Sequence, residues 1–514
     1  MSFMTCLKEE MNNRTQLTEN GAVGYVTTGK QLLDLNFSVT SLRNKPEDYI
    51  EDKFVKAFYE DKLTAIKWLF YLRDRKGIGE RRSFRIMMKY LASNHPEIAK
   101  AVLALIPEYG RFDDLWLFLD TELKDDVIAL VKKQLNEDAK NMMENKPISL
   151  LSKWIASENA SSKNTRKIAK TLRNGLGMTS KQYRKTLSKL RAYLKVVEVD
   201  MSAKRWENIN YSAVPSRANL IYNSAFLRND ETRRREYLAA LERGDKNVKI
   251  NASVLFPHDI VTKYIVNGYS RKVKEKDTTI EELWKALPDF VKGNGNTICV
   301  ADGSGSMTCT VGGTNVTALN VANALAIYFS ERCTGQFKDN YITFSQNPKL
   351  VDFSNAKTLK EKLEIAFRHN EVANTNIEAV FNLILKTAIN KKMTQDELPQ
   401  NILILSDMEF DSATYVYNSR SGYNRPNQTL FNNIAQKYAE HGYKLPRLVF
   451  WNICSRTGTI PVKQNDLGVA LVSGFSPAIV KMVLSNSTDP YECLLEQLNS
   501  ERYQPVEEAV KDIV

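Results

Sequence analysis

A change of pattern near residue 296 constrains the fold of this chain more than any other feature. The first half shows helical periodicity alone, whereas from residue 296 onward short apolar runs alternate with helical stretches. Such alternation predicts a doubly wound α/β sheet. The expected strands are Ile298–Ala301, Tyr341–Phe344, Asn401–Leu405, Leu448–Trp451 and Gly468–Val472, and the expected helices include Thr317–Glu331, Ile377–Asn390 and Gln428–His441.

The first half predicts an all-α module. Apolar residues recur at spacings of three and four in segments such as 63–70, 84–91 and 98–106, and glycines and prolines interrupt the pattern between them. A chain of 514 residues is also too long for one core. We therefore expect an α+β multidomain protein. Its expected parts are an all-α module over residues 1–292, an α/β domain over 296–485 and a C-terminal tail over 486–514 that is able to pack back on the helical module.

The first expected strand of the sheet ends in the sequence Asp-Gly-Ser-Gly-Ser. It places Asp302, Ser304 and Ser306 where functional groups of an open α/β sheet gather, at the carboxyl end of a strand. One carboxylate and two hydroxyls are oxygen ligands, which hard divalent cations such as Mg²⁺ prefer. The sequence thus favours an incompletely filled metal site that leaves a position for an outside acidic group; a flexible turn is the alternative.

Two later loops add polar groups of the same kind. Thr375 precedes an expected helix, and Asp407 directly follows the apolar run 403–405. Thr314 lies in a similar glycine–threonine–asparagine context, but it comes about a dozen residues after Asp302, and we favour Thr375 over it. Glu409 and Asp411 are expected to support the third loop or to lie at the surface.

Other chemistry has little support in the sequence. The four histidines are isolated from one another, and neither a Ser-His-Asp nor a Cys-His grouping is visible. The six cysteines lack paired spacing, which is typical of reduced thiols in a cytoplasmic protein. Apolar runs stay below the roughly 18 to 20 residues of a membrane span. We expect neither an enzyme nor a membrane protein.

The positive charge is concentrated in one block. Residues 151–250 carry a net charge of +13, so that the remainder of a chain with net charge +12 sums to −1. Between residues 159 and 197 no acidic residue occurs, although a surface helix normally mixes charges. The basic residues of this stretch, our candidate RNA-binding residues, are Lys163, Arg166, Lys167, Lys170, Arg173, Lys181, Arg184, Lys185, Lys189, Arg191 and Lys195.

Phosphate-binding cations interspersed with aromatic residues, which we expect to stack on bases, favour single-stranded nucleic acid as the partner of this block. The aromatic residues are Trp154, Tyr183, Tyr193, Trp206 and Tyr211. Motifs for sequence-specific readout are missing, so the expected binding is electrostatic and depends steeply on salt. A solvated helix face without a partner is the simplest alternative, and membrane attachment is less favoured.

The three polar loops resemble the metal-ion-dependent adhesion site of von Willebrand factor A domains. The Asp-x-Ser-x-Ser motif matches at Asp302, Ser304 and Ser306, Thr375 matches the second-loop threonine, and Asp407 matches the third-loop aspartate. The resemblance covers residues 296–485. It implies a Mg²⁺ or Mn²⁺ ion whose open position accepts a carboxylate from a partner protein.

A helical half with a basic belt followed by such a domain resembles the Ro ribonucleoprotein family with its TROVE module. It resembles still more closely the uncharacterised eukaryotic and viral relatives of that layout. The stretches that carry this likeness are 18–22 with 27–29, 73–80, 110–115, 250–253 with 257–258, and 471–476. The resemblance implies a ring of HEAT-like helical repeats, closed by the A domain, that holds single-stranded ends of structured or misfolded RNA.

We therefore expect a monomeric, non-enzymatic RNA-binding protein with a divalent-metal site for an acidic partner. A protein–protein scaffold that binds its partner through the metal site is the main alternative. A third possibility, a subunit of an ATP-driven remodelling machine, has no sequence feature of its own.

Overall fold

The chain forms two compact units in the computed structural model. The sheet unit consists of Met1–Glu60 and Ala252–Asn499, and the helical unit consists of Asp61–Asn251 and Ser500–Val514. The structure describes residues 15–266, 272–291, 296–312, 314–344, 347–371, 376–411, 416–418, 422–424, 430–461, 469–480 and 489–514.

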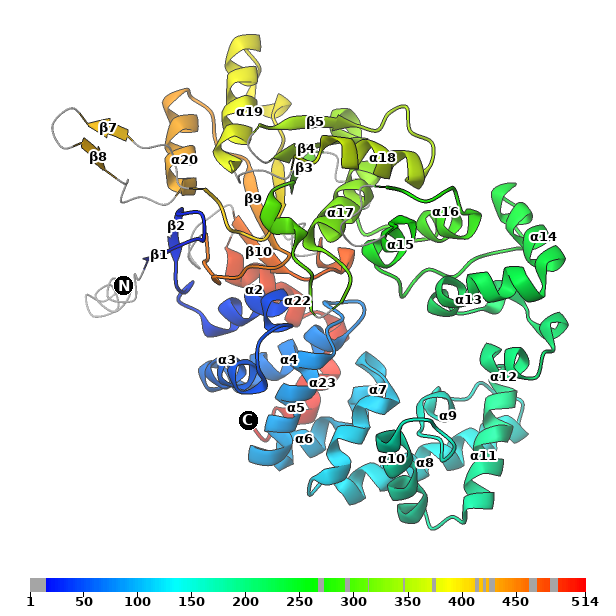
Figure 1. Ribbon diagram of the computed structural model, residues 1–514. Helices are drawn as coiled ribbons and strands as arrows, with labels where there is room; N and C mark the ends of the chain where they lie inside the picture. The colour runs from blue at the N-terminus through cyan, green and yellow to red at the C-terminus, as the bar shows by residue number, and fades with distance from the viewer. Residues whose placement is uncertain are drawn as a thin grey trace. The chain divides into compact units, whose positions relative to one another are not determined.

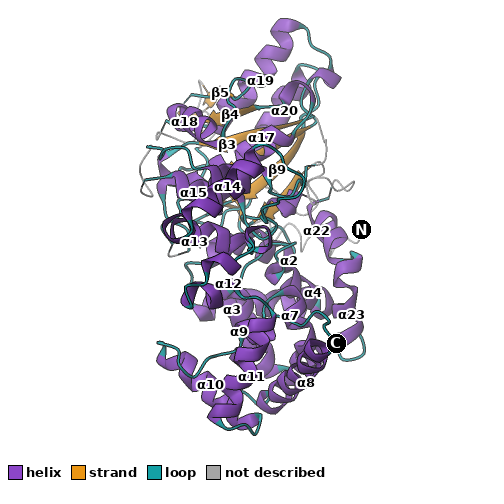
Figure 2. Cartoon of the chain, turned by 90° about the vertical axis from the view of Figure 1, so that its right-hand side faces the viewer, coloured by secondary structure: helices purple, strands orange, loops and turns teal. Residues whose placement is uncertain are grey.

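The sheet unit contains a six-stranded sheet of order β10-β9-β6-β3-β4-β5. Four of the five pairings are parallel, and only the edge strand β5 runs antiparallel to β4. Every residue of β3 and β10 is buried, as expected when helices cover both faces of a parallel sheet (Figure 2). The strands are β3 (Thr297–Asp302), β4 (Asn340–Phe344), β5 (Lys349–Asp352), β6 (Asn401–Ser406), β9 (Arg447–Asn452) and β10 (Val469–Ser473).

This sheet confirms the predicted doubly wound α/β fold. All five predicted strands are present, within one or two residues of their expected ends, apart from Gly468, which lies outside the described residues. β5 was not predicted, because only one of its four residues, Val351, is buried and the alternation is therefore weak. The helices between the strands are α17 (Ala318–Arg332), α18 (Leu359–His369), α19 (Ile377–Lys391) and α20 (Leu430–Glu440), and α22 (Pro490–Leu498) follows the last strand.

Segments from outside the sheet region also belong to the sheet unit, so the compact units do not follow the expected boundaries at 292 and 485. Helix α2 (Gln31–Leu42) packs on β9 and β10, and α15 (Pro257–Tyr264) packs on α17 (Figure 1). The Asn452 amide donates to the Phe37 carbonyl at 2.8 Å, which fixes α2 to the sheet. The remaining elements of this group are β1 (Thr15–Leu17), β2 (Val23–Tyr25), α3 (Glu47–Glu60) and α16 (Thr278–Lys285).

The helical unit is built from short amphipathic helices, as the periodicity predicted. Asp61 begins the first of them by accepting a hydrogen bond from the Thr64 amide at 3.0 Å, and Pro96 lies in the first turn of α6, where its missing N–H is tolerated. No helix among the described residues is long and apolar enough to cross a membrane. The helices are α4 (Lys62–Arg73), α5 (Arg82–Asn94), α6 (Pro96–Val102), α7 (Ile106–Tyr109), α8 (Lys124–Met143), α9 (Leu151–Trp154), α10 (Lys163–Gly175), α11 (Ser180–Tyr193), α12 (Val197–Ser202), α13 (Ser216–Asn229), α14 (Glu231–Glu242) and α23 (Gln504–Val510).

Candidate metal site and basic helical face

Two carboxylates meet at the carboxyl edge of the sheet. Asp302 is the last residue of β3, Asp407 directly follows β6, and these two strands are neighbours. The connections run outward from this point in opposite directions, to β4 on one side and to β9 on the other. It is therefore the topological switch point of the sheet, where open α/β folds place their ligands.

The Asp302 side chain is fully buried and held by hydrogen bonds on both oxygens. Its Oδ1 accepts from the Ser304 amide at 2.9 Å, and its Oδ2 accepts from the Ser406 hydroxyl at 2.6 Å. The hydroxyls of Ser304 and Ser306 lie 2.9 Å apart. The structure thus brings together three residues of the predicted motif. Ser406, which orients the carboxylate, was not predicted, although its place beside Asp407 at the end of β6 is a usable signal.

Asp407 is also fully buried, and one of its oxygens accepts no hydrogen bond from a described residue. Its Oδ1 accepts from the Glu409 amide at 3.2 Å, whereas Oδ2 makes no hydrogen bond of ordinary geometry with any described residue. Burial, and then the neighbouring Asp407 carboxylate, raise the pKa of Asp302 to about 7. Burial raises the pKa of Asp407 as well. The surroundings thus disfavour two negative charges side by side, and a proton or a cation would stabilise the pair.

These groups fit a hard divalent cation. The donor atoms are all oxygens, and Oδ2 of Asp407, which accepts no hydrogen bond from a described residue, is a buried acceptor that a cation would satisfy. Within the described part of the chain, no three histidine, cysteine, aspartate or glutamate side chains are grouped as metal ligands. The candidate site therefore depends on two carboxylates and on serine hydroxyls.

The predicted threonine ligand, Thr375, lies outside the described residues, but its neighbourhood is described on both sides. A Cβ atom on Gly303 would lie 2.9 Å from Thr343 Oγ1 and 3.4 Å from Asn370 Oδ1, so Asn370 lies next to the Asp-Gly-Ser-Gly-Ser loop. Thr314, the less favoured candidate, is exposed and donates its hydroxyl to the Val311 carbonyl at 2.6 Å within its own turn.

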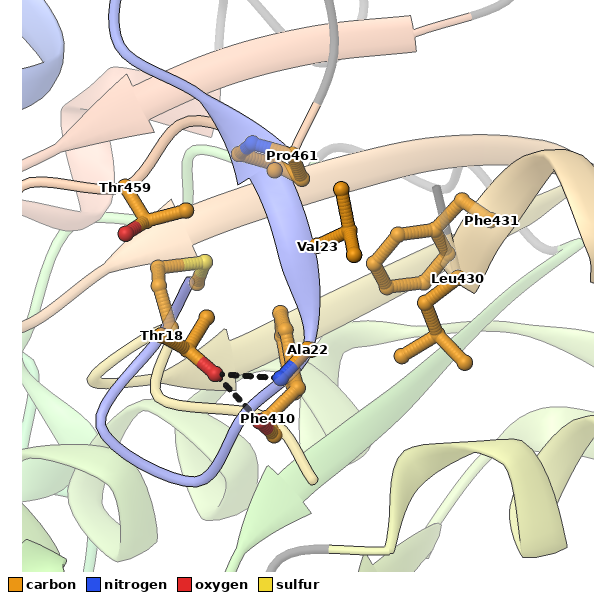
Figure 3. A pocket seen from close by; sticks show the side chains of 10 residues that line it. Thr18, Ala22, Val23, Phe410, Leu430, Phe431, Thr459 and Pro461 are labelled. Atoms are coloured by element: carbon orange, nitrogen blue, oxygen red, sulfur yellow. Dashed lines mark hydrogen bonds between the residues drawn. The ribbon is translucent and has the colours of Figure 1, made fainter. Parts of the chain in front are cut away.

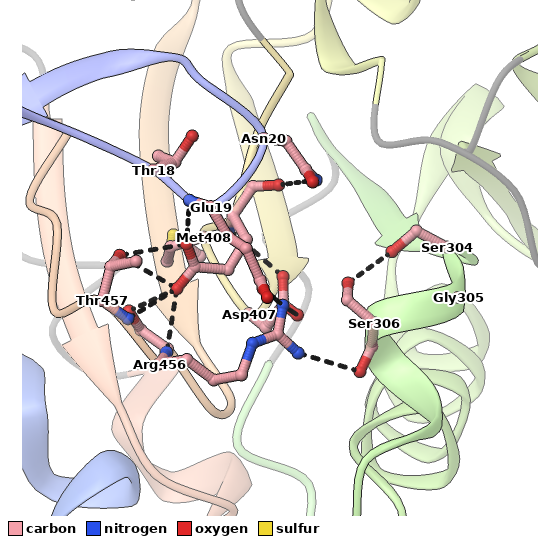
Figure 4. Close-up of polar contacts among 12 residues, drawn as sticks. Thr18, Glu19, Asn20, Ser304, Gly305, Ser306, Asp407, Met408, Arg456 and Thr457 are labelled. Atoms are coloured by element: carbon pink, nitrogen blue, oxygen red, sulfur yellow. Dashed lines mark hydrogen bonds and ion pairs between the residues drawn. The ribbon is translucent and has the colours of Figure 1, made fainter.

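A third carboxylate, Glu409, organises the loops around the site. It is fully buried, and it accepts hydrogen bonds from the backbone amides of Glu19 at 2.9 Å, Arg456 at 2.8 Å and Thr457 at 2.9 Å. This agrees with the supporting role expected for Glu409. The Arg456 guanidinium pairs with the Glu19 carboxylate and approaches Asp407, with 3.5 Å between Nη2 and Oδ2 (Figure 4). Neither Glu19 nor Arg456 was predicted at this site.

A small hollow beside the site lies against the turn between β1 and β2 (Figure 3). Thr18 anchors that turn, because its hydroxyl donates to the Phe410 carbonyl at 2.6 Å and accepts from the Ala22 amide at 2.9 Å. The lining includes Thr18, Ala22, Val23, Phe410, Phe431 and Pro461. The N-terminal segment is therefore packed firmly against the residues that follow β6.

Helices α10 and α11 of the helical unit carry the predicted basic residues. Ser162 caps α10, and Thr179 with Gln182 forms a capping box at α11, so both helices begin at well-defined residues. Each helix buries an apolar stripe, formed by Ala169 and Leu172 in α10 and by Tyr183, Leu187 and Leu190 in α11. We call the exposed cations of the two helices the basic face: Lys163, Arg166, Lys167, Lys170, Lys181, Arg184, Lys185 and Lys189.

Two of the predicted arginines lie apart from this face. Arg173 binds Ser180 Oγ at 2.6 Å and Glu158 Oε1 at 3.2 Å, and Arg191 donates to the Ser152 carbonyl at 2.7 Å. Both are half-buried and hold neighbouring loops in place. Lys195 follows α11 and is exposed.

The aromatic residues near the basic face mostly belong to the interior, contrary to the expectation that they stack on bases. Tyr183 is buried and donates its hydroxyl to the Ala156 carbonyl at 2.8 Å, and Tyr211 is buried in the core between α13 and α14. Trp206 packs against that same core. Tyr193 donates to the Lys146 carbonyl at 2.9 Å, and the Trp154 ring is covered by the Arg111 guanidinium at 3.8 Å.

Comparison with known proteins finds relatives along the whole chain. The family described as Domain of unknown function (DUF2828) matches residues 18–172 and 159–297, and Domain of unknown function (DUF7788) matches residues 296–512. Uncharacterized protein L728 of Acanthamoeba polyphaga mimivirus is 30% identical over 530 residues, which cover 95% of this chain and 88% of that protein. The expected viral relative is thereby confirmed.

A solved structure is also similar. It is the RO (RSR) protein of Deinococcus radiodurans, at 15% identity and a TM-score of 0.44, over 85% of this chain and 92% of that one. The family assignment comes from the sequence matches, because the first family covers more than half of the 514 residues and the viral relative covers nearly all of them. The chain belongs to the DUF2828 family.

Proposed function

We propose that this protein binds RNA, holding single-stranded regions through the basic face of α10 and α11, and that it does so without catalysing a reaction. The observation that carries the proposal is the arrangement of these two helices. Each buries apolar residues on one side and presents lysines and arginines on the other, in a stretch without any acidic residue between 159 and 197. Such a face suits a chain of phosphates.

The proposed binding is mainly electrostatic. Lys163, Lys170, Lys181 and Lys185 are exposed, and no ion pair to another described residue occupies them. Lysine ammonium groups on flexible stems approach phosphate oxygens without demanding one base sequence. Because Tyr183 and Tyr211 are buried, base stacking on them contributes nothing. Weak sequence preference and steep salt dependence follow.

The sheet unit contributes a divalent-metal site in this proposal. Asp302, Ser304, Ser306 and Asp407, together with Thr375, would hold Mg²⁺ or Mn²⁺. The bound ion would supply a positive centre that accepts an acidic group of a protein partner. The buried Oδ2 of Asp407, which accepts no hydrogen bond from a described residue, is the observation that supports this part.

Binding of a labelled single-stranded RNA tests the RNA proposal, with duplex RNA and single-stranded DNA as competitors. Changing Lys163, Arg166, Lys167 and Lys170 to glutamate is expected to weaken RNA binding by at least about a hundredfold at low salt. A matched control changes four exposed lysines of the sheet unit to glutamate and has the same net charge: Lys338, Lys357, Lys386 and Lys391. If both variants lost RNA affinity equally, net charge alone would explain the loss, and a specific RNA-binding surface would be contradicted.

A protein scaffold is the second candidate function, favoured by the two buried carboxylates of Asp302 and Asp407 at the sheet edge, where a bound ion would accept an acidic group of a partner. In that case a partner protein would be captured in the presence of Mg²⁺ and lost with Asp302→Ala, while the α10 variant would still capture it. RNA binding that survives in Asp302→Ala but fails in the α10 variant would instead support the RNA proposal.

A further inference from the structure

A positively charged side chain already lies beside the proposed metal ligands. Arg456 follows β9, and its Nη2 lies 3.5 Å from Asp407 Oδ2, the oxygen that lacks a hydrogen bond within the described residues. Its Nη1 lies 3.5 Å from the Ser306 carbonyl oxygen. The guanidinium therefore faces two of the residues that would hold the metal (Figure 4).

Arg456 is held in position at both its backbone amide and its guanidinium group. Its backbone amide donates to the buried Glu409 carboxylate at 2.8 Å, and its guanidinium pairs with the Glu19 carboxylate. Glu409 also accepts from the Glu19 amide at 2.9 Å, so one buried carboxylate positions both partners of the ion pair. The Thr18–Ala22 stretch, which carries part of the family likeness, thus has a structural role at this site.

The segment that carries Glu19 is tied to the loop that carries Arg456. Tyr25 of β2 and Ile460 exchange two backbone hydrogen bonds of 2.7 and 2.9 Å. A Cβ atom on Gly24 would lie 2.4 Å from Thr459 Cγ2, so glycine is needed for this close approach. Glu19 is therefore held where it can attract the guanidinium away from Asp407.

We infer that Arg456 sets the metal affinity of the sheet-edge site, as an internal cation that competes with the divalent ion for Asp407, and that Glu19 is the acid that retains Arg456 when the ion binds. The inference rests on the metal site of the proposed function. A guanidinium and a divalent cation repel each other strongly at such short range in a buried setting. The ion gains its ligand only as the arginine moves away from Asp407, and the existing ion pair with Glu19 retains the arginine in that position.

The competition predicts opposite effects for two substitutions. Arg456→Gln removes the competing charge and is expected to tighten Mn²⁺ binding by about tenfold or more. Glu19→Gln removes the alternative partner, leaves Arg456 with Asp407, and is expected to weaken Mn²⁺ binding several-fold. Arg456→Lys keeps the charge and is expected to bind Mn²⁺ much as the unaltered protein does. If Arg456 served only as a structural clamp, both of its substitutions would weaken binding.

The experiment measures Mn²⁺ dissociation constants for the full chain by the electron paramagnetic resonance signal of the free ion. Arg368→Gln, on the exposed side of α18, is the matched control for charge and is expected to leave the constant unchanged. Asp302→Asn identifies the site, because it is expected to abolish the high-affinity binding both in the otherwise unaltered protein and when combined with Arg456→Gln. Thermal unfolding of each variant verifies that the fold is retained.

The possible outcomes test the role of Arg456 separately from the existence of the metal site. Binding that depends on Asp302 but is unchanged or weaker in Arg456→Gln overturns the inference and leaves the metal site standing. Binding that survives Asp302→Asn, or is missing from every variant, overturns both. Tighter binding in Arg456→Gln with weaker binding in Glu19→Gln supports both.

Discussion

At the scale of single residues, Asp114 shows how the helical unit stabilises a buried charge. Its carboxylate is fully buried and accepts from Arg73 at 2.8 Å, Arg85 at 2.9 Å and Arg81 at 3.1 Å. Burial alone would raise its pKa, but these three guanidinium groups outweigh burial and lower the pKa below its ordinary value. The charged form is therefore the one that the fold favours.

A pH-dependent stability follows from this shift. The folded pKa lies below the unfolded value of about 4, so the stabilisation is fully present above that value and is lost as the pH falls through the folded pKa. Asp114→Asn is expected to lower the free energy of unfolding at pH 7 by about 3 to 5 kcal/mol, because it removes the buried acid that three arginines share and leaves only Arg81 in an ion pair with another described carboxylate, that of Asp113. It is also expected to flatten the loss of stability below about pH 4. Urea unfolding at several pH values measures both effects.

The exposed Glu122→Gln provides the control, since it removes one carboxylate from the same unit without touching a buried pair. It is expected to change the free energy of unfolding by less than about 0.5 kcal/mol. If the free energy of unfolding decreased with falling pH in the same way in Asp114→Asn and in the unaltered protein, carboxylates other than Asp114 would govern acid unfolding.

At the scale of elements, α23 completes the core of the helical unit. Val506 and Val510 are fully buried, and α23 contacts α4 and α6. Just before this helix, the ring of Tyr503 stacks on Tyr109, with 5.7 Å between the ring centroids. Val506→Asp is expected to cost at least about 3 kcal/mol, because it buries an unpaired carboxylate. Hydrogen exchange of the α4 and α6 amides measures the local loss, and the exposed Glu508→Ala on the same helix is expected to leave exchange unchanged.

The elements also show what could be predicted from sequence. The strands of the sheet were predictable because a buried parallel strand is a continuous apolar run, as in Leu403–Leu405 of β6. The placement of α2 was not, because amphipathic periodicity indicates that a helix face is buried but not what covers it. In α11, Tyr183 has the spacing of the buried stripe, with Leu187 four residues later. That signal could have identified Tyr183 as a core residue instead of a base-stacking surface.

Some residues of the candidate site could likewise be predicted from the sequence, and others could not. Asp302 and Asp407 were predictable from their position at strand ends, since the carboxyl ends of neighbouring parallel strands meet at one edge. Glu19 and Arg456 were not, because they meet through contacts between segments more than four hundred residues apart in sequence. Short-range spacing contains no information about such a pair.

At the scale of the whole molecule, the positive charge is concentrated in one part of the chain, and this predicts how RNA binding depends on salt. The chain has a net charge of +12, yet residues 151–250 alone carry +13. If RNA binds this block through phosphates, the logarithm of the association constant should fall linearly with the logarithm of the salt concentration. For single-stranded nucleic acid, the magnitude of this slope decreases by about 0.7 for each phosphate contact that is lost.

Both helices of the basic face should contribute to this slope. Reversing the four cations of α10, Lys163, Arg166, Lys167 and Lys170, is expected to reduce its magnitude by up to about 3, and reversing Lys181, Arg184, Lys185 and Lys189 of α11 should have a similar effect. The four-lysine variant of the sheet unit is expected to keep the full slope, since its cations would contact no phosphate. Titrations of labelled single-stranded RNA across a salt series measure all four proteins. A slope that drops equally in all three variants would mean that RNA responds to net charge alone, whereas a drop confined to α10 would restrict the RNA-binding surface to that helix.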